Sequence, residues 1–392
     1  MIRTLQRLIL VSDGRLVRFG IVAVLMVVLV GLAFVTLRLG PTVTPALAAA
    51  PLLLLLALSR LEYGPVVILF AAAFVRFALP TGTQSEIVAS MALTGILIAV
   101  WLLKMVAVEK RLHLEPAATN VPLLGFIVAV LFSYLWGNAF RDPLVVTWST
   151  WPFVQLGALA EMVLLPGAFL LTANTVRSTR LLKAITVLMS GAGALYLSGF
   201  LIMMGVPSQR ETMRALISQF NSGGMFSMWF GLLIYTQILF NKRLPQWLRL
   251  GLVGLLVVWV YRFFVVGVTW MAGWFVPAVA FMAVSFLRSK RFFLVLLLLL
   301  AIYLALNWNY LVGVVAAREA SESGYTRLRA YQQNWQVTQY HFLFGMGPVG
   351  YAVYYMTYFP NVAMASHSDY IDVLAQTGVV GLALYLAFFG AL

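Results

Sequence analysis

Residues suited to acid–base chemistry lie in one stretch near the end of the chain, Ser366-His367-Ser368-Asp369-Tyr370, which leads into an apolar run that continues to Leu392. Ser366 and Asp369 have the spacing of a capping box, which opens a helix just before its apolar run. The pattern predicts that His367 is the first residue of a membrane helix, at the positive end of the helix dipole. That end favours neutral imidazole and anions such as phosphate. This suggests chemistry on a lipid-linked phosphate, although the local pattern alone favours a plain helix cap with His367 as an interfacial side chain.

Composition indicates that these residues belong to a membrane protein. Hydrophobic residues make up 62% of the chain and charged residues 10%, whereas soluble domains average about 45–50% and about 25%. Apolar segments near membrane-spanning length recur throughout, which is typical of a polytopic helical protein. The chain has no cysteine, which excludes disulfides and thiol catalysis. The net charge of +14 falls in short clusters between apolar runs, which indicates membrane topology and excludes a nucleic-acid groove.

We expect an all-α, polytopic fold with about twelve transmembrane helices in a single domain, residues 1–392. The predicted spans are 19–37, 43–58, 63–80, 87–108, 121–138, 151–172, 184–205, 225–240, 250–268, 269–287, 292–310 and 370–392. The first is longer than the core of a signal peptide, so it is interpreted as a retained anchor.

The distribution of Lys and Arg predicts the orientation of these spans. With the N-terminus inside, 17 of the 26 basic residues fall in inner loops and 7 in outer ones, while Arg76 and Arg262 lie within spans. Short basic loops resist translocation, so this bias supports an inner N-terminus. His367 is then expected on the outer side, at the end of a large loop before the last span.

Most outer arginines lie in two loops, residues 206–224 and 311–369, and long loops of this kind usually carry function. In the first loop the sequence predicts a short interfacial helix with Arg210 and Arg214 four residues apart. Like charges at this spacing repel by a few tenths of a kcal/mol, roughly. An anion between them would relieve that repulsion, and contact with lipid headgroups is the alternative.

The second loop contains Arg318, Arg327 and Arg329, followed by aromatic residues at a helix-like spacing that predicts a helix over the mouth of the bundle. After it comes Gly345-Met346-Gly347-Pro348-Val349-Gly350. This string matches G-x-G-x-x-G, but it lacks the strand–helix setting of a dinucleotide site, so that interpretation is rejected. The glycines indicate a tight turn, and the alternative is a turn that aims its backbone amides at phosphate oxygens.

Three ionisable residues lie inside predicted spans: Arg76, Glu161 and Arg262. Each costs roughly 2.5–3.5 kcal/mol at a helix centre, so we expect them to face a cavity or one another. A structural Glu161–arginine pair and a functional role, in which the arginines neutralise a diphosphate, both stay open. No His/Asp/Glu cluster has the spacing of a magnesium or zinc site, so no metal and no other cofactor is expected.

Three motifs lie near the end of the chain: Phe344-Gly345-Met346-Gly347-Pro348, Ser366-His367-Ser368-Asp369-Tyr370 and Leu374-Ala375-Gln376-Thr377-Gly378-Val379-Val380-Gly381. In this order they resemble the signature of the O-antigen ligase/polymerase superfamily. The span count and the arginine loop agree with it. The chain departs from the family pattern in having Ser368 where Asn is frequent. It also has Thr269-Trp270-Met271-Ala272-Gly273 where the family often has Ser-Arg-Gly.

The resemblance implies an inverting, metal-independent membrane glycosyltransferase on the periplasmic face of a bacterial inner membrane. Its donor would be an undecaprenyl-diphosphate-linked glycan. His367 would be the essential histidine, acting as general base on the acceptor hydroxyl. Arg210 or Arg214 would match the arginine of the earlier periplasmic loop and hold the leaving diphosphate. The substrate-binding residues expected with them are Arg327, Arg329, Arg76, Arg262, Asp369 and Gly347.

The acceptor separates two members of this superfamily. A polymerase, slightly favoured here by the His-Ser-Asp-Tyr form, extends another lipid-linked repeat, whereas a ligase transfers the glycan to lipid A–core. Membrane lipids and chain-length regulator proteins are further expected partners, and no nucleic acid is expected. A lipid-linked glycan transporter and a non-catalytic assembly partner are the rival classes.

Overall fold

The structure is a computed structural model that describes residues 60–75, 78–80, 86–219, 224–267, 271–316, 325–360 and 368–392. The predicted spans at 19–37 and 43–58 lie outside the described residues, as do Arg76, Arg318 and His367. The backbone of Arg327 is described but its side chain is not.

The first half of the described chain is helical except for one short hairpin. Its elements are η1 (Leu61–Tyr63), α4 (Gly64–Phe74), β1 (Ala78–Pro80), β2 (Glu86–Val88), α5 (Ala89–Leu103), the π-helix η2 (Lys104–Val108), α6 (Asn120–Ala139), α7 (Trp151–Thr175) and α8 (Thr179–Gly205). β1 pairs antiparallel with β2 in the register Ala78 to Val88. The predicted span at 63–80 is therefore wrong after Phe74, where α4 ends. Pro80 disfavours helical backbone in the residue before it, so the helix cannot continue through Leu79.

The second half contains a longer series of helices. These are η3 (Pro207–Gln209), α9 (Arg210–Gln219), α10 (Gly224–Phe240), α11 (Gln246–Val260), the π-helix η4 (Tyr261–Val266), α12 (Met271–Arg288), α13 (Lys290–Leu306), α14 (Trp308–Tyr310), the π-helix η5 (Leu311–Ala316), α15 (Tyr325–Thr338), η7 (Gln339–His341), α16 (Gly350–Tyr358) and α17 (Asp369–Ala391). The short helix predicted in the first arginine loop is observed as η3 and α9. The helix predicted in the second arginine loop is observed as α15, and its place over the bundle mouth stays a prediction.

Local sequence explains where several helices begin. Ser178 caps α8 by accepting a hydrogen bond from the Leu181 N–H at 3.3 Å, and Ser289 caps α13 by accepting one from the Phe292 N–H at 3.4 Å. Side-chain oxygens at this position satisfy amides that the first turn leaves unbonded. α7 has a proline in its first turn, where its missing N–H carries no cost.

Among the described residues, six helices are long and apolar enough to cross a membrane. They are α5 with η2, α6, α7, α8, α11 with η4, and α17. This is the composition of a multi-pass membrane protein. Twelve spans, and a periplasmic location for the loop before α17, stay predictions.

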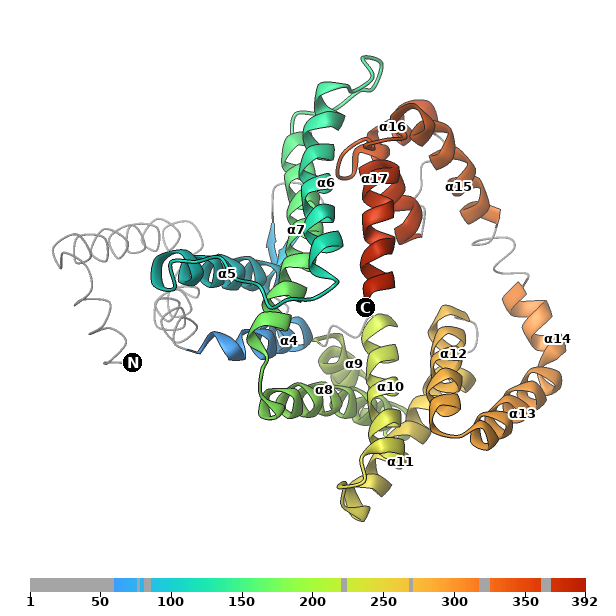
Figure 1. The fold of residues 1–392 in the computed structure, drawn as a ribbon. Helices are drawn as coiled ribbons and strands as arrows, with labels where there is room; N and C mark the ends of the chain where they lie inside the picture. The colour runs from blue at the N-terminus through green and yellow to red at the C-terminus, as the bar shows by residue number, and fades with distance from the viewer. Residues whose placement is uncertain are drawn as a thin grey trace.

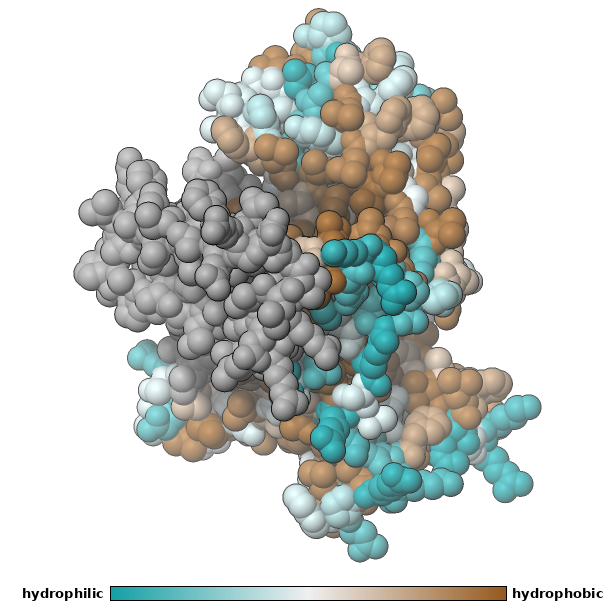
Figure 2. All heavy atoms as spheres, turned by 60° about the vertical axis from the view of Figure 1, so that its left-hand side comes forward, coloured by the Kyte–Doolittle hydropathy of each residue, from teal (hydrophilic) through white to brown (hydrophobic). Residues whose placement is uncertain are grey.

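The C-terminal helix packs into the middle of the described bundle. α6, α7 and α17 run side by side and α5 packs across α7, while α8 packs against α10 and α11, which lie with α12 and α13 in the lower part of the view (Figure 1). Phe126 and Val130 of α6 form a buried apolar cluster with Val373 of α17. α15 and α16 pack against α17. Figure 2 shows hydrophobic residues over much of one face, with a paler, more hydrophilic group at its upper end.

Candidate active site

Helix α17 is broken in its middle at Gly378. This residue has φ 68° and ψ −172°, so the helix divides into Asp369–Thr377 and Val379–Ala391. In an unbroken helix the Val379 and Val380 amides would bond to the carbonyls of Ala375 and Gln376. Such groups cannot be left unpaired in a membrane interior.

The glycine-rich turn before α16 takes over these hydrogen bonds. The Met346 and Gly347 amides donate to the carbonyls of Ala375 at 2.9 Å and Gln376 at 3.0 Å. In return, the Val379 and Val380 amides donate to the carbonyls of Phe342 at 2.8 Å and Leu343 at 3.3 Å. The break is thus closed by four backbone hydrogen bonds from one turn.

Glycine is required where the turn and the broken helix touch. Gly345 and Gly378 both have positive φ, a conformation that other residues adopt at a cost. A Cβ at Gly345 would overlap the backbone of Gln376, and one at Gly378 would overlap the backbone of Leu343. A Cβ at Gly137 of α6 would overlap the Met346 carbonyl. The turn is therefore wedged between α6 and α17.

This arrangement corrects one expectation. The tight turn predicted from the glycines is observed, but the Met346 and Gly347 amides are bonded to α17. Gly347 is also buried. The geometry therefore does not support Gly347 as a donor to phosphate.

Side chains reinforce the same junction. The Ser133 hydroxyl of α6 donates to the Gln376 carbonyl. The Gln376 side-chain oxygen accepts from the Val349 amide at 2.8 Å. Val349 has φ 54°, a strained value for a β-branched residue. The hydrogen bond from the Val349 N–H to the Gln376 side chain helps to hold this conformation.

α17 begins at Asp369, with Ser368 as its N-cap residue. The expectation that His367 is the first helical residue is therefore wrong, because His367 precedes the helix by two positions. Asp369 and Asp372 lie in the first turn, where carboxylates interact well with the helix dipole. The Tyr351 hydroxyl of α16 is hydrogen bonded to Asp372, and burial together with this carboxylate raises the pKa of Tyr351.

A cavity of about 560 Å³ lies between α6, α7 and α17, and its polar lining includes Glu161, Asp369, Asp372 and Gln376. Glu161 therefore faces a cavity, as its place in a span predicted. The ion pairs seen among the described residues join Lys104 to Glu109 and Arg177 to Glu115, so a Glu161–arginine pair is not among them.

The predicted arginines divide into two groups. Arg210 and Arg214 are exposed on α9, which packs against α8 and lies beyond the C-terminal end of α17 in the view of Figure 1. The described residues therefore do not bring them to the beginning of α17. Arg329 is exposed on α15, which packs against α16 and α17. Arg327 lies on the same helix.

Arg262 lies in the π-helix η4 and is half-buried. Its guanidinium carbon is 5.2 Å from the centre of the Phe200 ring and 5.4 Å from that of Phe263. These are cation–π distances. Its Nε is buried and has no hydrogen-bond partner among the described atoms. Within the described part of the chain, the Arg262 guanidinium is thus held by aromatic rings.

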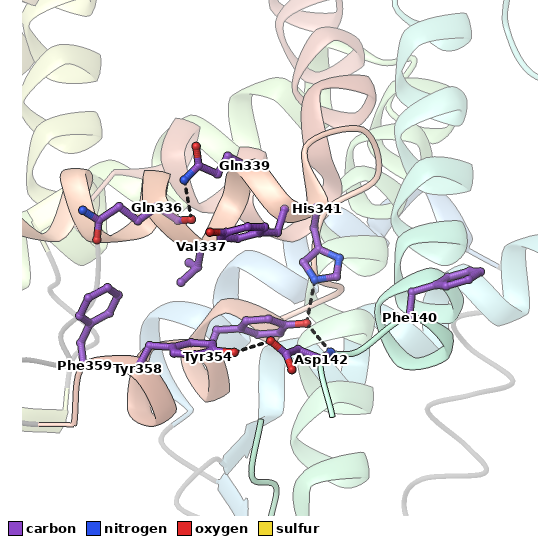
Figure 3. Close-up of a pocket in the computed structure, with 10 residues that line it drawn as sticks. Phe140, Asp142, Gln336, Val337, Gln339, His341, Tyr354, Tyr358 and Phe359 are labelled. Atoms are coloured by element: carbon purple, nitrogen blue, oxygen red, sulfur yellow. Dashed lines mark hydrogen bonds between the residues drawn. The ribbon is translucent and has the colours of Figure 1, made fainter. Parts of the chain in front are cut away.

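A second polar site, which the sequence did not predict, lies between the α6–α7 connection and the α15–α16 segment. We call it the Asp142 pocket; Phe140, Asp142, Gln336, His341, Tyr354 and Tyr358 line it, and its volume is about 650 Å³ (Figure 3). The Asp142 amide donates to the Tyr354 hydroxyl at 3.0 Å, which is 2.8 Å from His341 Nε2. The Tyr358 hydroxyl donates to the Asp142 carboxylate.

These contacts set the charges in the pocket. The hydrogen bonds from Tyr358 and from the Leu144 amide lower the pKa of Asp142, so its carboxylate stays ionised. Burial lowers the pKa of His341, and the smaller effect of Asp142 opposes it, which leaves the imidazole neutral near pH 7. The one available signal in the sequence was the tyrosine repeat of α16, Tyr351, Tyr354, Tyr355 and Tyr358.

Comparison with known proteins supports the resemblance noted from the sequence. A model of the family described as O-antigen ligase matches residues 263–386, from η4 through most of α17. The resemblance to the O-antigen ligase/polymerase superfamily is confirmed. The matched segment includes α15, the glycine turn, His367 and the break at Gly378. It supports a role in O-antigen or surface polysaccharide synthesis for a multi-pass membrane protein. Neither the curated proteins nor the solved structures gave a match.

Proposed function

We propose that this chain is an inverting glycosyltransferase that acts on undecaprenyl-diphosphate-linked glycan at the periplasmic face of a bacterial inner membrane. Polymerisation of repeat units is favoured over ligation to lipid A–core. The observation that carries the proposal is the O-antigen ligase match, which covers His367 together with the broken helix that follows it.

In the proposed reaction an acceptor hydroxyl attacks the anomeric carbon from the face opposite the diphosphate. His367 takes the hydroxyl proton as general base, a role that contributes about 10²–10⁴-fold. The C–O bond to the diphosphate breaks as the new glycosidic bond forms, so the configuration inverts. Because the diphosphate leaves as a stable anion, the reaction needs no separate general acid.

The two acidic residues of the first turn suit the sugar better than the diphosphate. Asp369 is exposed and Asp372 is bonded to Tyr351. Carboxylates repel a diphosphate and accept hydrogen bonds from hydroxyl groups. We therefore assign Asp369 to positioning a sugar hydroxyl near His367.

Arginines then have to bind the diphosphate without a metal. Guanidinium groups bind phosphate oxygens in a bidentate way and neutralise charge as the leaving group departs. Packing of α15 against α17 favours Arg327 and Arg329 for this role. Arg210, Arg214, Arg262 and Arg76 stay in the proposal as residues to be tested beside them.

The acceptor is identified by deleting the gene in the source strain and separating the surface glycans by electrophoresis. A polymerase leaves single-repeat glycan on the core, and a ligase leaves long glycan that is not attached to the core. Complementation with the wild type must restore the pattern, and complementation with His367→Ala must not. Normal glycans in the deletion strain would refute the proposed function.

Transport of a lipid-linked glycan is the second candidate, because transporters place substrate at discontinuous helices and α17 is discontinuous. The backbone groups at this break are hydrogen bonded to the glycine turn, so they are not available to bind a substrate. Liposomes that move the lipid-linked glycan without forming a glycosidic bond would favour transport.

A further inference from the structure

We propose that the Asp142 pocket is a binding subsite for the glycan part of the substrate, separate from the place where the glycosidic bond forms. The inference rests on the proposed function and specifies which part of the protein recognises the sugar. It is argued from the lining of the pocket, from the way its walls are fixed and from its connection to α17.

The lining combines aromatic rings with groups that bind hydroxyls. Tyr340 and Phe140 line the pocket with 80% and 58% of their surface exposed, so neither ring is used to build the core. A pyranose ring presents C–H groups on its faces, which pack against aromatic rings, and hydroxyls at its edge. Gln336 and Gln339 offer amide donors and acceptors on the same wall.

The volume also fits such a ligand. At about 650 Å³, the pocket lies inside the range of about 300–1,000 Å³ that small-molecule sites occupy. Such sites have mostly apolar walls with a few placed polar groups. In Figure 3, Gln336 on α15 and Gln339 in η7 belong to the segment that lies across from Tyr354 and Tyr358 on α16, and Asp142 lies at the end of the two tyrosine side chains.

The walls are fixed in the absence of ligand. Asp142 is held at three points, by the Tyr354 hydroxyl, the Tyr358 hydroxyl and the Leu144 amide. The Tyr355 hydroxyl donates to the Ala330 carbonyl at 2.6 Å and ties α16 to α15. A ligand that enters such a pocket loses little free energy to ordering the protein.

The charges favour a polyol over the diphosphate. Asp142 is an ionised carboxylate, and His341 is neutral. Neither provides the positive charge that a diphosphate requires. Arg141 acts electrostatically on Tyr354 but is not among the residues that line the pocket. The carboxylate, the tyrosine hydroxyls and the amides can each exchange hydrogen bonds with sugar hydroxyls.

The pocket is continuous with the elements that hold α17. Val337 and Tyr354 from its lining belong to one buried cluster with Met346 of the glycine turn and Ala375 of α17. Tyr351, on the same helix as Tyr354, is bonded to Asp372. A glycan whose reacting end lies at the beginning of α17 can therefore extend along α16 into the pocket.

The test uses the full-length protein in nanodiscs and the repeat-unit oligosaccharide of the source strain, released from its lipid by mild acid. Binding is followed by saturation-transfer NMR, and transfer is followed with the intact lipid-linked glycan. The variants are Tyr340→Ala and Gln336→Ala, both on exposed side chains that folding does not need. Trp247→Ala removes an aromatic ring that is 73% exposed on α11, outside the pocket, and is the matched control.

We expect Tyr340→Ala and Gln336→Ala to weaken oligosaccharide binding by about tenfold, and to raise KM with kcat changed by less than about twofold. Trp247→Ala and His367→Ala should bind as the wild type does. Wild-type binding and KM in both pocket variants would overturn the subsite. If the wild-type protein binds the oligosaccharide but forms no glycosidic bond, and Tyr340→Ala weakens that binding, the subsite would be supported and the proposed function refuted.

Discussion

Gly345 and Gly378 meet across the junction between the glycine turn and the broken helix, each with positive φ and each against the backbone of the other segment. Backbone atoms alone make this contact between two segments that are far apart in sequence. Since neither position has room for a Cβ, the junction depends on two hydrogen atoms in place of side chains. The direction of the last membrane helix therefore depends on the turn before α16.

Substitution of either glycine should separate the two segments. Gly378→Ala places a side chain in a backbone region that costs about 1–3 kcal/mol for residues other than glycine, and its Cβ overlaps Leu343. We expect a clear fall in the thermal midpoint of the purified protein and loss of transfer, and the same for Gly345→Ala.

Gly390→Ala is the matched control, because nothing lies within 4 Å of the added carbon. It should gain slightly in stability through its helix propensity. If Gly378→Ala unfolds at the same temperature as Gly390→Ala, the junction does not support α17.

Local sequence was sufficient to predict most helices and insufficient to predict this junction. α6 was predicted at 121–138 and found at Asn120–Ala139, because length and hydropathy are local properties. The break at Gly378 lies within an equally apolar run, and its hydrogen bonds reach residues 342–347, which no window on α17 contains. A single glycine in such a run is compatible with an unbroken helix.

The Asp142 pocket was missed for a related reason. Asp142 and Tyr354 are 212 residues apart in the chain, so only the packing of α16 on the α6–α7 connection brings them together. The arginines depend on packing in the same way. Spacing predicted an anion between Arg210 and Arg214, and the family resemblance assigned them to the leaving diphosphate, whereas the structure packs α9 on α8. Spacing within a helix defines a face of that helix and does not define the helix it meets.

Gln376 should matter for stability more than its half-buried position suggests. Replacing it with leucine leaves the Val349 amide without its acceptor, and an unpaired buried amide costs about 1–3 kcal/mol. Ser133→Ala should cost only about 1 kcal/mol, because the Gln376 carbonyl keeps its bond from Gly347.

Thermal or denaturant unfolding in detergent measures both effects. Gln339→Leu is the control, since Gln339 is exposed and its side-chain amide donates to the nearby Gln336 carbonyl. It should change stability by less than about 0.5 kcal/mol. Equal losses for Gln376→Leu and Gln339→Leu would show that the Val349 bond has no special role.

The two groups of arginines can be separated by kinetics. Diphosphate binding by α15 predicts that Arg327→Ala and Arg329→Ala lower kcat/KM by about 10²-fold, as removal of a charge-stabilising donor does. Arg210→Ala and Arg214→Ala, on α9, should then change it by less than about threefold.

The measurement is transfer with purified protein and lipid-linked glycan, with Arg→Lys variants to test for bidentate contact. A large loss in the α9 variants together with normal activity in the α15 variants would reverse the assignment. In that case α9 must come to the beginning of α17 during the reaction.

Docking of the α6–α7 connection onto α16 should weaken in mild acid. Burial lowers the pKa of His341 in the folded protein, whereas a histidine in the unfolded chain keeps a value of about 6.5. The unfolded state therefore binds more protons in the window below that value, and the stability that neutral His341 contributes is lost as pH falls through it. Asp142 has a lowered pKa and stays ionised in this window.

Hydrogen exchange of residues 140–150 and α16, corrected for intrinsic rates, should be faster at about pH 5.5 than at about pH 7.5. His341→Gln can still bond to Tyr354 but does not titrate, so it should remove the difference, while His113→Gln in the α5–α6 connection should keep it. A pH effect that persists unchanged in His341→Gln would mean that another group controls the docking.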